Sequence, residues 1–256
     1  MRIQYTRRWV NLVTFILLII TNILANYLKL NNQTTGEVAD KFPTYFVPAS
    51  FTFLIWGLIY LLLLSFTIYQ FKRRNKRNPY IVAVGYWFSL SNILSSLWLV
   101  LWHYEVIVYA FFTMIALTIT LVKIYYNIIT CRYRAKLTDN ILVKVPFTMY
   151  LSWISFATIA NLDILLYSLD WNQWGLSKEA WFIVLLGLVT MLISFLLLFR
   201  KDMIFWLVFA WGFWGIRSRF HDVGLIRKSI TVAFIVITLF WVLTFIKKRK
   251  DRNIFR

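Results

Sequence analysis

The sequence predicts an all-α integral membrane protein with about eight transmembrane helices, and three observations support this fold class. First, the 256 residues are 61% hydrophobic and only 15% charged, with a mean hydropathy of +0.68. A single water-soluble core of this size could not bury so much apolar surface. Second, apolar segments long enough to cross a bilayer recur along the chain. Third, the basic residues gather in short stretches between these segments, so the net charge of +18 indicates membrane topology rather than nucleic-acid binding.

Eight apolar segments follow one another in the sequence. They are residues 9–28, 50–71, 80–102, 106–126, 145–167, 180–199, 203–216 and 230–246. Seven of them reach or approach the length of about 20 residues that a helix needs to span the hydrocarbon core. Segment 203–216 is shorter. It is either a short span whose flanking Lys201 and Arg217 reach the interfaces, or a re-entrant segment packed against other helices.

The first segment follows three arginines, as the apolar core of a secretory signal peptide does. It is long for such a core, however, and asparagines at positions 11, 22 and 26 interrupt it. No small-residue cleavage site follows it. We therefore expect this segment to remain as the first transmembrane helix.

The loop charges predict the orientation in the cell membrane. With a cytoplasmic N-terminus and eight spans, the inner stretches contain 21 of the 28 Lys and Arg residues and the outer stretches contain 7. Cytoplasmic loops of membrane proteins carry such an excess of positive charge. We therefore predict a multi-pass protein with both termini in the cytoplasm. The outer stretch 217–228, with four basic residues, is the one element that disagrees with this orientation.

A loop with two prolines, Pro43 and Pro48, leads directly into the second segment. Thr52, Trp56 and Tyr60 are spaced four residues apart there, which would align them on one helix face and place hydroxyls and an indole at membrane depth. Aromatic residues near a membrane surface also serve as interfacial anchors, which is the alternative interpretation.

Polar side chains recur at helical spacing in the third segment, at Ser89, Asn92 and Ser96. A polar group at membrane depth has to face protein or water, so this face should point inward. His103 continues the same line to the outer helix end, where we expect an exposed or interfacial histidine rather than a metal ligand.

In the fifth segment, Trp153, Ala157 and Asn161 are four residues apart. The small Ala157 between two larger side chains would leave a dent in that face. Helix packing is the alternative explanation for these polar faces, since hydrogen bonds of Ser and Asn between membrane helices contribute about 0.6 to 2 kcal/mol.

The sequence contains no zinc-binding spacing, phosphate-binding glycine loop or dinucleotide fingerprint, and it has only two histidines. We therefore expect no enzyme activity, no catalytic or metal-binding residues, no obligatory cofactor and no nucleic-acid partner.

Taken in order, the motifs of residues 9–172 resemble the TspO/MBR family of translocator proteins and tryptophan-rich sensory proteins. They are Phe42-Pro43 to Val47-Pro48, Trp56 and Ile59-Tyr60, then Asn92 and Ser96, and then Pro146-Phe147, Trp153, Ala157 and Ala160-Asn161. The chain departs from the family pattern because Ser95 stands where Trp is usual and the proline pair is not intact. Three further apolar segments make it similar to the extended bacterial branch with additional C-terminal helices.

This resemblance implies a five-helix bundle in residues 1–172 and an extension of about three transmembrane helices in residues 173–256. It further implies a receptor or carrier for flat hydrophobic ligands, namely tetrapyrroles such as porphyrin or haem and also sterol-like lipids, with a sensory or transport role. The lipid bilayer, this ligand and a second copy in a homodimer are the expected partners. The expected ligand-binding residues are Pro48, Thr52, Trp56, Tyr60, Asn92, Ser96, Trp153, Ala157 and Asn161.

Two alternatives remain open at this point. A secondary transporter of another small solute would need coupling charges near the bilayer midplane, but the only acidic residue inside a predicted helix is Asp163, close to its outer end. A membrane scaffold or interaction protein without a small ligand would use the polar faces for packing alone.

Overall fold

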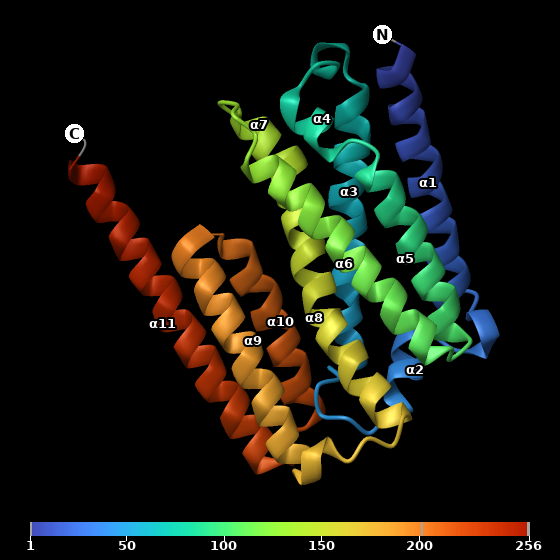
Figure 1. Ribbon diagram of the computed structural model, residues 1–256, viewed down its shortest axis with the longest axis vertical. Coiled ribbons are helices and arrows are strands. Elements are labelled where there is room, and N and C mark those ends of the chain that lie inside the picture. The colour runs from blue at the N-terminus through green and yellow to red at the C-terminus, as the bar shows by residue number, and fades with distance from the viewer. Residues whose placement is uncertain (1, 201, 255–256) are drawn as a thin grey trace. The chain divides into compact units, whose positions relative to one another are not determined.

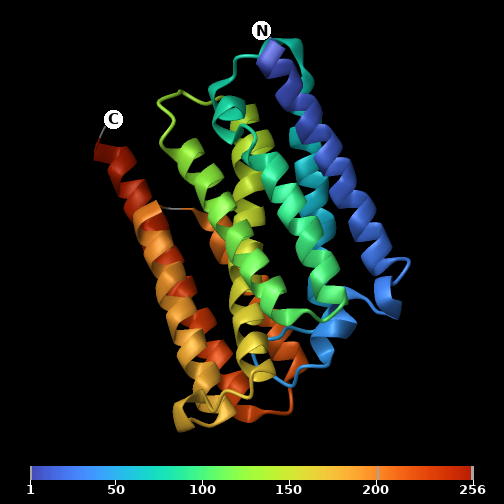
Figure 2. The ribbon, with the colours of Figure 1, turned by 45° about the vertical axis from the view of Figure 1, so that its right-hand side comes forward.

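The computed structural model describes residues 2–200 and 202–254, and within them the side chains of residues 6–197 and 202–243. The structure is 82% helical, and none of the described residues forms a strand. Figures 1 and 2 show long helices joined by short loops. The predicted all-α class is therefore confirmed.

The chain divides into two compact units. Unit 1 contains the chain up to Phe42 and the stretch Phe53–Ser168. Unit 2 contains Pro43–Thr52 and the chain from Leu169 onward. The loop with the two prolines is thus part of the same unit as the C-terminal helices.

Unit 1 is built around five long helices. They are α1 (Arg2–Asn26), α3 (Ile55–Phe71), α5 (Trp87–His103), α6 (Ile107–Ile129) and α8 (Val145–Ser168). Helix α5 packs between α1 and α6, and α8 packs against α3 and α6. The shorter elements are α2 (Thr35–Asp40), α4 (Pro79–Val84), α7 (Leu137–Asp139), a π-helical turn at Asn140–Lys144 and the 3-10 helices Leu30–Asn32 and Arg73–Asn75.

Aromatic rings from three helices form the centre of unit 1. Phe66 of α3 contacts Phe147 of α8, with ring centroids 4.9 Å apart, and Phe88 of α5 contacts both of them. All three side chains are fully buried. Their edge-to-face arrangement adds to the energy of apolar burial and fixes the distances between the helices.

The predicted third segment forms two helices instead of one. The Asn78 side chain caps α4 by accepting a hydrogen bond from the Tyr80 amide at 2.9 Å, and Pro79 occupies the first helical position. Gly85 then ends α4 with a φ of +58°, a value that favours glycine. The remaining helix α5 has only 17 residues.

Unit 2 contains three helices that pack against one another. They are α9 (Lys178–Arg200), α10 (Met203–Arg219) and α11 (Gly224–Ile254). The Asp202 side chain caps α10, and the 3-10 helix Gln173–Gly175 precedes α9. The loop of unit 2 is held to α10 by a hydrogen bond of 3.1 Å from the Ala49 amide to the Gly215 carbonyl.

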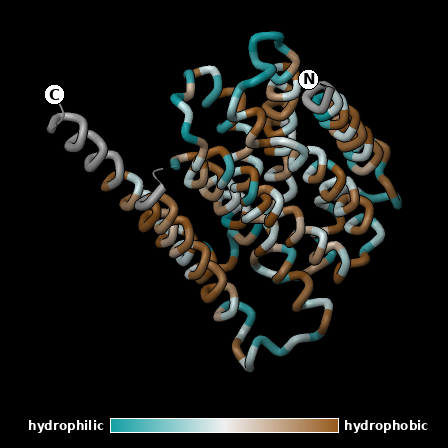
Figure 3. Tube along the Cα trace, turned by 45° about the horizontal axis from the view of Figure 1, so that its top comes forward, coloured by the Kyte–Doolittle hydropathy of each residue, from teal (hydrophilic) through white to brown (hydrophobic). Residues whose placement is uncertain are grey.

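Within the described part of the chain, six helical stretches are long and apolar enough to cross a membrane. They are Thr6–Asn26, Ser50–Phe71, Ile107–Ile129, Leu137–Ser168, Lys178–Leu197 and Gly224–Leu243. Figure 3 shows hydrophobic residues along the helices and hydrophilic ones in the loops. The chain is therefore a multi-pass membrane protein.

Two predicted spans, represented by α5 and α10, are shorter than these six. Each has 17 residues, which corresponds to about 26 Å at 1.5 Å per residue, against a hydrocarbon core of about 30 Å. The count of about eight spans thus stays a prediction. So does the choice between a short span and a re-entrant segment for residues 203–216, and Lys201, which flanks that segment, lies outside the described residues.

Candidate functional site

Five aromatic residues of α3 and α8 gather inside unit 1, and we refer to them as the aromatic cluster. Trp56 stacks on Tyr60 at a centroid distance of 5.3 Å, one helical turn away on α3. Across the helix interface, the Trp56 ring meets the edges of Tyr150 at 5.9 Å and Trp153 at 6.4 Å. Trp153 in turn stacks on Phe156 at 5.5 Å. The predicted site residues Trp56, Tyr60 and Trp153 are therefore brought together.

Four buried polar atoms in and beside this cluster lack a complete set of hydrogen-bond partners among the described residues: the two hydroxyls interact only with each other, and the other two atoms have no partner. They are the Trp153 Nε1, the Tyr150 hydroxyl, the Ser95 Oγ and the Asn92 Oδ1. All four side chains are at most 2% exposed. A buried polar group without a partner costs about 1 to 3 kcal/mol and is rare in native proteins. Such groups indicate a place where a bound molecule or water supplies the missing hydrogen bonds.

The four atoms come from only two helices. Asn92 and Ser95 are three residues apart on α5, and Tyr150 and Trp153 are three residues apart on α8, so each pair shares one helix face. The Tyr150 hydroxyl lies beside Ser95, which joins the two faces. The faces of α5 and α8 thus present the Trp153 Nε1 and the Asn92 oxygen without partners and a Tyr150–Ser95 hydroxyl pair that has no other partner.

The two predicted asparagines differ in how much of each amide remains available. Asn92 donates to the Thr14 Oγ1 at 3.2 Å and keeps its oxygen free. Asn161 accepts a hydrogen bond of 3.0 Å from the Trp98 indole and donates to the Ala157 carbonyl at 2.9 Å. Asn161 therefore has mainly a structural role in this conformation, whereas Asn92 retains an acceptor.

The remaining predicted residues of unit 1 lie on the expected helices. Ala157 is half-buried on α8, one turn after Trp153 and one turn before Asn161. The Ser96 hydroxyl donates to the carbonyl of Asn92 at 3.0 Å, a bond within its own helix. A ligand-binding role for Ala157 and Ser96 stays a prediction.

Pro48 and Thr52 lie in unit 2, apart from the other predicted residues in the division of the chain. Thr52 is in the 3-10 helix Ser50–Leu54, which has three residues per turn, and its carbonyl accepts a hydrogen bond of 2.9 Å from the Trp211 indole. Thr52 thus lies in the 3-10 helix before α3, whereas Trp56 and Tyr60 lie in α3 itself. The single stripe of three residues stays a prediction.

Sequence reasoning missed Tyr150, Ser95 and Trp98. The signal for Tyr150 was its position three residues before Trp153, on the same helix face. Ser95 lies on the buried face of α5, and Trp98, three residues later, donates a hydrogen bond from its indole to Asn161.

Of the two expected positions of His103, exposed or interfacial, the exposed one is wrong, because its side chain is fully buried. Its Nδ1 lies 2.7 Å from the Leu99 carbonyl. The segment between α1 and α2 covers this helix end, and Asn31 and Gln33 both donate to the main-chain carbonyl of His103. Among the described residues, no three His, Cys, Asp or Glu side chains are grouped so that they could hold a metal ion.

Comparison with known proteins identifies a family. No curated protein and no solved structure matches the chain. A family model described as TSPO-like protein matches residues 8–246. This match includes the helices of unit 2 and so extends well beyond residues 9–172, where the sequence motifs lie. The chain therefore belongs to the TSPO-like protein family.

Proposed function

We propose that this protein binds a flat hydrophobic ligand in the helical bundle of unit 1 and has a sensory or transport role in the cell membrane. A tetrapyrrole such as porphyrin or haem is the favoured ligand, with sterol-like lipids second. The observation that supports this most directly is the set of buried polar atoms with missing hydrogen-bond partners beside the aromatic cluster, above all the Trp153 Nε1 and the Asn92 oxygen. We propose that the protein binds its ligand without converting it and that the lipid bilayer surrounds it. A homodimer stays a prediction.

The chemistry of the aromatic cluster and of the buried polar atoms beside it favours a ligand with several polar atoms on a flat apolar ring system. Indole and phenol rings offer faces and edges for stacking on such a ring system. The Trp153 Nε1 and one hydroxyl of the Tyr150–Ser95 pair can donate to carboxylate oxygens, and the Asn92 oxygen can accept from a ring N–H. A porphyrin has both kinds of group, whereas a sterol has a single hydroxyl. Few polar groups in an apolar pocket are typical of small-molecule sites.

A spectral titration of the purified protein tests this proposal. We expect protoporphyrin and haem to bind saturably near one molecule per chain and to quench tryptophan fluorescence, because three indoles lie in or next to the site. Non-saturating partition, equal to that of detergent micelles without protein, would contradict the proposal and favour the scaffold alternative.

A variant at Ala157 localises the site. Ala157→Phe should abolish porphyrin binding, because the added ring fills space on the face shared with Trp153 without adding a charge or an unpaired polar group. Ala116→Phe, at a half-buried alanine of α6, adds the same volume elsewhere in unit 1 and is the matched control. Trp241→Phe in unit 2 should also be nearly silent.

These variants are informative only if they fold. Yield from the membrane and the thermal midpoint in detergent should stay close to the parent values for all three. A folded Ala157→Phe protein that binds porphyrin as well as the parent does would exclude this face of α8 as the ligand site.

A further inference from the structure

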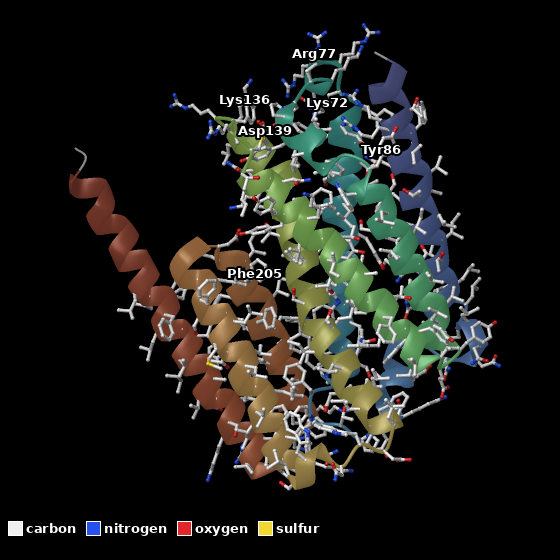
Figure 4. The ribbon with its side chains drawn as sticks, viewed as in Figure 1. Lys72, Arg77, Tyr86, Lys136, Asp139 and Phe205 are labelled. Atoms are coloured by element: carbon white, nitrogen blue, oxygen red, sulfur yellow. The ribbon has the colours of Figure 1, made fainter. Side chains whose placement is uncertain are left out.

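A second polar site lies at the end of unit 1 where α4 and α7 are found, and the proposed ligand site does not use it. Residues 72–78 follow α3 and residues 130–136 follow α6, and side chains of both loops line a cavity of about 630 Å³. Figure 4 shows Arg77, Lys136 and Asp139 at this end of the unit. We call it the basic cavity.

Asp139 holds the two loops together at the base of this cavity. Its carboxylate is fully buried and accepts hydrogen bonds from the Tyr69 hydroxyl at 2.8 Å, the Asn78 amide at 2.6 Å and the Tyr133 hydroxyl at 3.2 Å. It also accepts from the main-chain amide of Lys136 at 3.0 Å. The donors in these four bonds are neutral groups, so the carboxylate is satisfied without the cationic side chains.

Three cations line the same cavity, from Arg74, Arg77 and Lys136. Their side chains are exposed, and none of them forms an ion pair with a residue in the described part of the chain. With Asp139 as the one carboxylate among the lining residues, three positive charges face one negative charge. The cavity therefore favours an anion.

A neighbouring tyrosine adds no negative charge near neutral pH. Burial raises the pKa of Tyr133, and its hydrogen bond to Asp139 raises that pKa further. The phenol thus stays protonated and continues to donate to the carboxylate.

The charge alone has a simpler explanation, because basic residues at the cytoplasmic ends of spans set membrane topology. That role needs no particular arrangement, and a random-coil loop fulfils it. Here both loops are ordered around a buried carboxylate, and three of their basic residues line one cavity while Arg73, Arg132 and Arg134 of the same loops do not. The arrangement, rather than the number of charges, indicates a ligand.

We propose that the basic cavity binds a phosphate monoester, carried either by a membrane lipid or by a soluble compound. A planar guanidinium can donate two parallel hydrogen bonds to a phosphate, and a lysine ammonium adds a point charge. The dianionic monoester would balance the net charge of the cavity. Cationic pockets at the ends of membrane helices lie at the depth of lipid headgroups, and the volume also suits a small soluble ligand.

Binding measurements with three soluble probes distinguish the ligand sources. Dioctanoyl phosphatidic acid has a phosphate monoester, dioctanoyl phosphatidylglycerol has a phosphodiester, and glycerol 3-phosphate is the monoester without acyl chains. We expect the full-length protein in detergent to bind phosphatidic acid saturably and at least tenfold more tightly than phosphatidylglycerol. Equal binding of glycerol 3-phosphate would assign the site to a soluble ligand, and much weaker binding would assign it to a lipid. Equal affinity for both lipids, or binding of no monoester, would overturn the proposal.

Two triple variants with the same loss of charge separate the cavity from diffuse attraction. The first, Arg74→Gln, Arg77→Gln and Lys136→Gln, removes the cations of the cavity. The second, Arg73→Gln, Arg132→Gln and Arg134→Gln, removes three exposed cations of the same two loops that do not line it. The first should weaken phosphatidic acid binding at least tenfold, and the second by less than twofold. Equal effects of both triples, or no effect of the first, would overturn the proposal, and unchanged thermal midpoints without probe would show that both proteins are folded.

Discussion

The ring and the hydroxyl of Tyr150 allow a packing role and a ligand-binding role to be tested separately. Its ring packs against Trp56 and is fully buried, as any core aromatic would be. Its hydroxyl, in contrast, has no partner among the described residues other than the Ser95 hydroxyl. Phenylalanine would serve the packing role equally well, so the hydroxyl is the part of the side chain through which a ligand role can be tested.

We therefore predict effects of Tyr150→Phe on both stability and binding. The variant should lose no more than about 1.5 kcal/mol of stability, because only the interaction with the Ser95 hydroxyl is removed. Porphyrin affinity should fall, because the ligand loses a donor. Thermal unfolding in detergent and porphyrin titration measure the two effects.

Tyr60→Phe is the matched control within the aromatic cluster. The Tyr60 hydroxyl accepts a hydrogen bond of 3.0 Å from the Asn22 amide, so its removal should lower the thermal midpoint. A Tyr150→Phe protein that keeps full porphyrin affinity would contradict a ligand role for this hydroxyl.

Sequence patterns predicted which residues form the candidate site, but they did not predict which of their polar atoms are left without a hydrogen bond. Trp56 and Trp153 stood out because indoles and small residues recur at helical spacing, and the structure brings both into one cluster. The sequence could not show that the Trp98 indole donates a hydrogen bond to the Asn161 side chain, whereas the side-chain oxygen of Asn92 has no partner among the described residues. Hydrogen-bond satisfaction depends on distances between helices, which a single sequence with no alignment does not contain.

At the scale of the elements, the loop Pro43–Thr52 is shaped by its contact with α10. A Cβ atom at Gly215 would lie 2.1 Å from the Thr52 Oγ1 and 2.9 Å from the Pro48 Cβ. Thr52 could rotate its side chain, but the proline ring is fixed to the backbone. Only glycine allows α10 and the loop to approach this closely.

Gly215→Ala should therefore lower the thermal midpoint of the protein, with a loss of about 1 to 3 kcal/mol from overpacking. Gly187→Ala on α9 is the matched control, because a Cβ there meets nothing within 4 Å. Alanine is the better helix former, so the control should be unchanged or slightly more stable. Equal midpoints for the two variants would show that the loop does not pack on α10 in this way.

The segment that covers the end of α5 should loosen at low pH. Glu105 accepts hydrogen bonds from Lys41 and from Gln33, and these bonds lower its pKa from the ordinary 4.5, with Lys41 as the larger cause. The folded state thus favours the ionised carboxylate. Its contribution is complete above pH 4.5 and is lost as the pH falls through the lowered pKa.

Hydrogen exchange of residues 30–42, corrected for intrinsic rates, measures this effect at pH 6 and pH 3. We expect faster exchange at pH 3, by a factor that corresponds to less than about 1 kcal/mol because both partners are partly exposed. In Glu105→Gln, exchange should already be faster at pH 6. The same pH response in the parent and this variant would assign it to another carboxylate.

Hydropathy predicted the existence of the long helices, but it did not predict their ends. Gly85 divides the predicted segment 80–102, because a positive φ interrupts the helix without any change in hydropathy. In the fifth segment, a π-helical turn and α7 continue the helical stretch back to Leu137 through polar and basic residues. Capping and turn geometry fix such boundaries, and apolar periodicity does not detect them.

At the scale of the whole molecule, the arrangement of unit 1 places basic stretches of the chain at a common end, while the side of the membrane that this end faces stays a prediction. The N-terminal end of α1, α4 and α7 lie at one end of this unit, and α2 lies at the other (Figures 1 and 2). The basic loops 72–78 and 130–136 adjoin α4 and α7, so three stretches that were assigned to the cytoplasm lie at the same end. The predicted orientation and its inverse both require this arrangement, so the choice between them needs a separate measurement.

Reporter fusions test the orientation and the number of spans together. A fusion after Arg77 should report a cytoplasmic location and a fusion after Gly175 an outer location, because 21 of 28 basic residues then face the cytoplasm. The opposite pair of results would invert the whole topology.

A third fusion after Asp222 decides whether α10 crosses the membrane. If this 17-residue helix crosses the membrane, residue 222 lies outside and the C-terminus inside. If α10 is re-entrant, the third fusion reads as cytoplasmic and α11 crosses outward. The basic stretch 217–228 then faces the cytoplasm, but the six basic residues of 247–256 face outward, contrary to the predicted orientation.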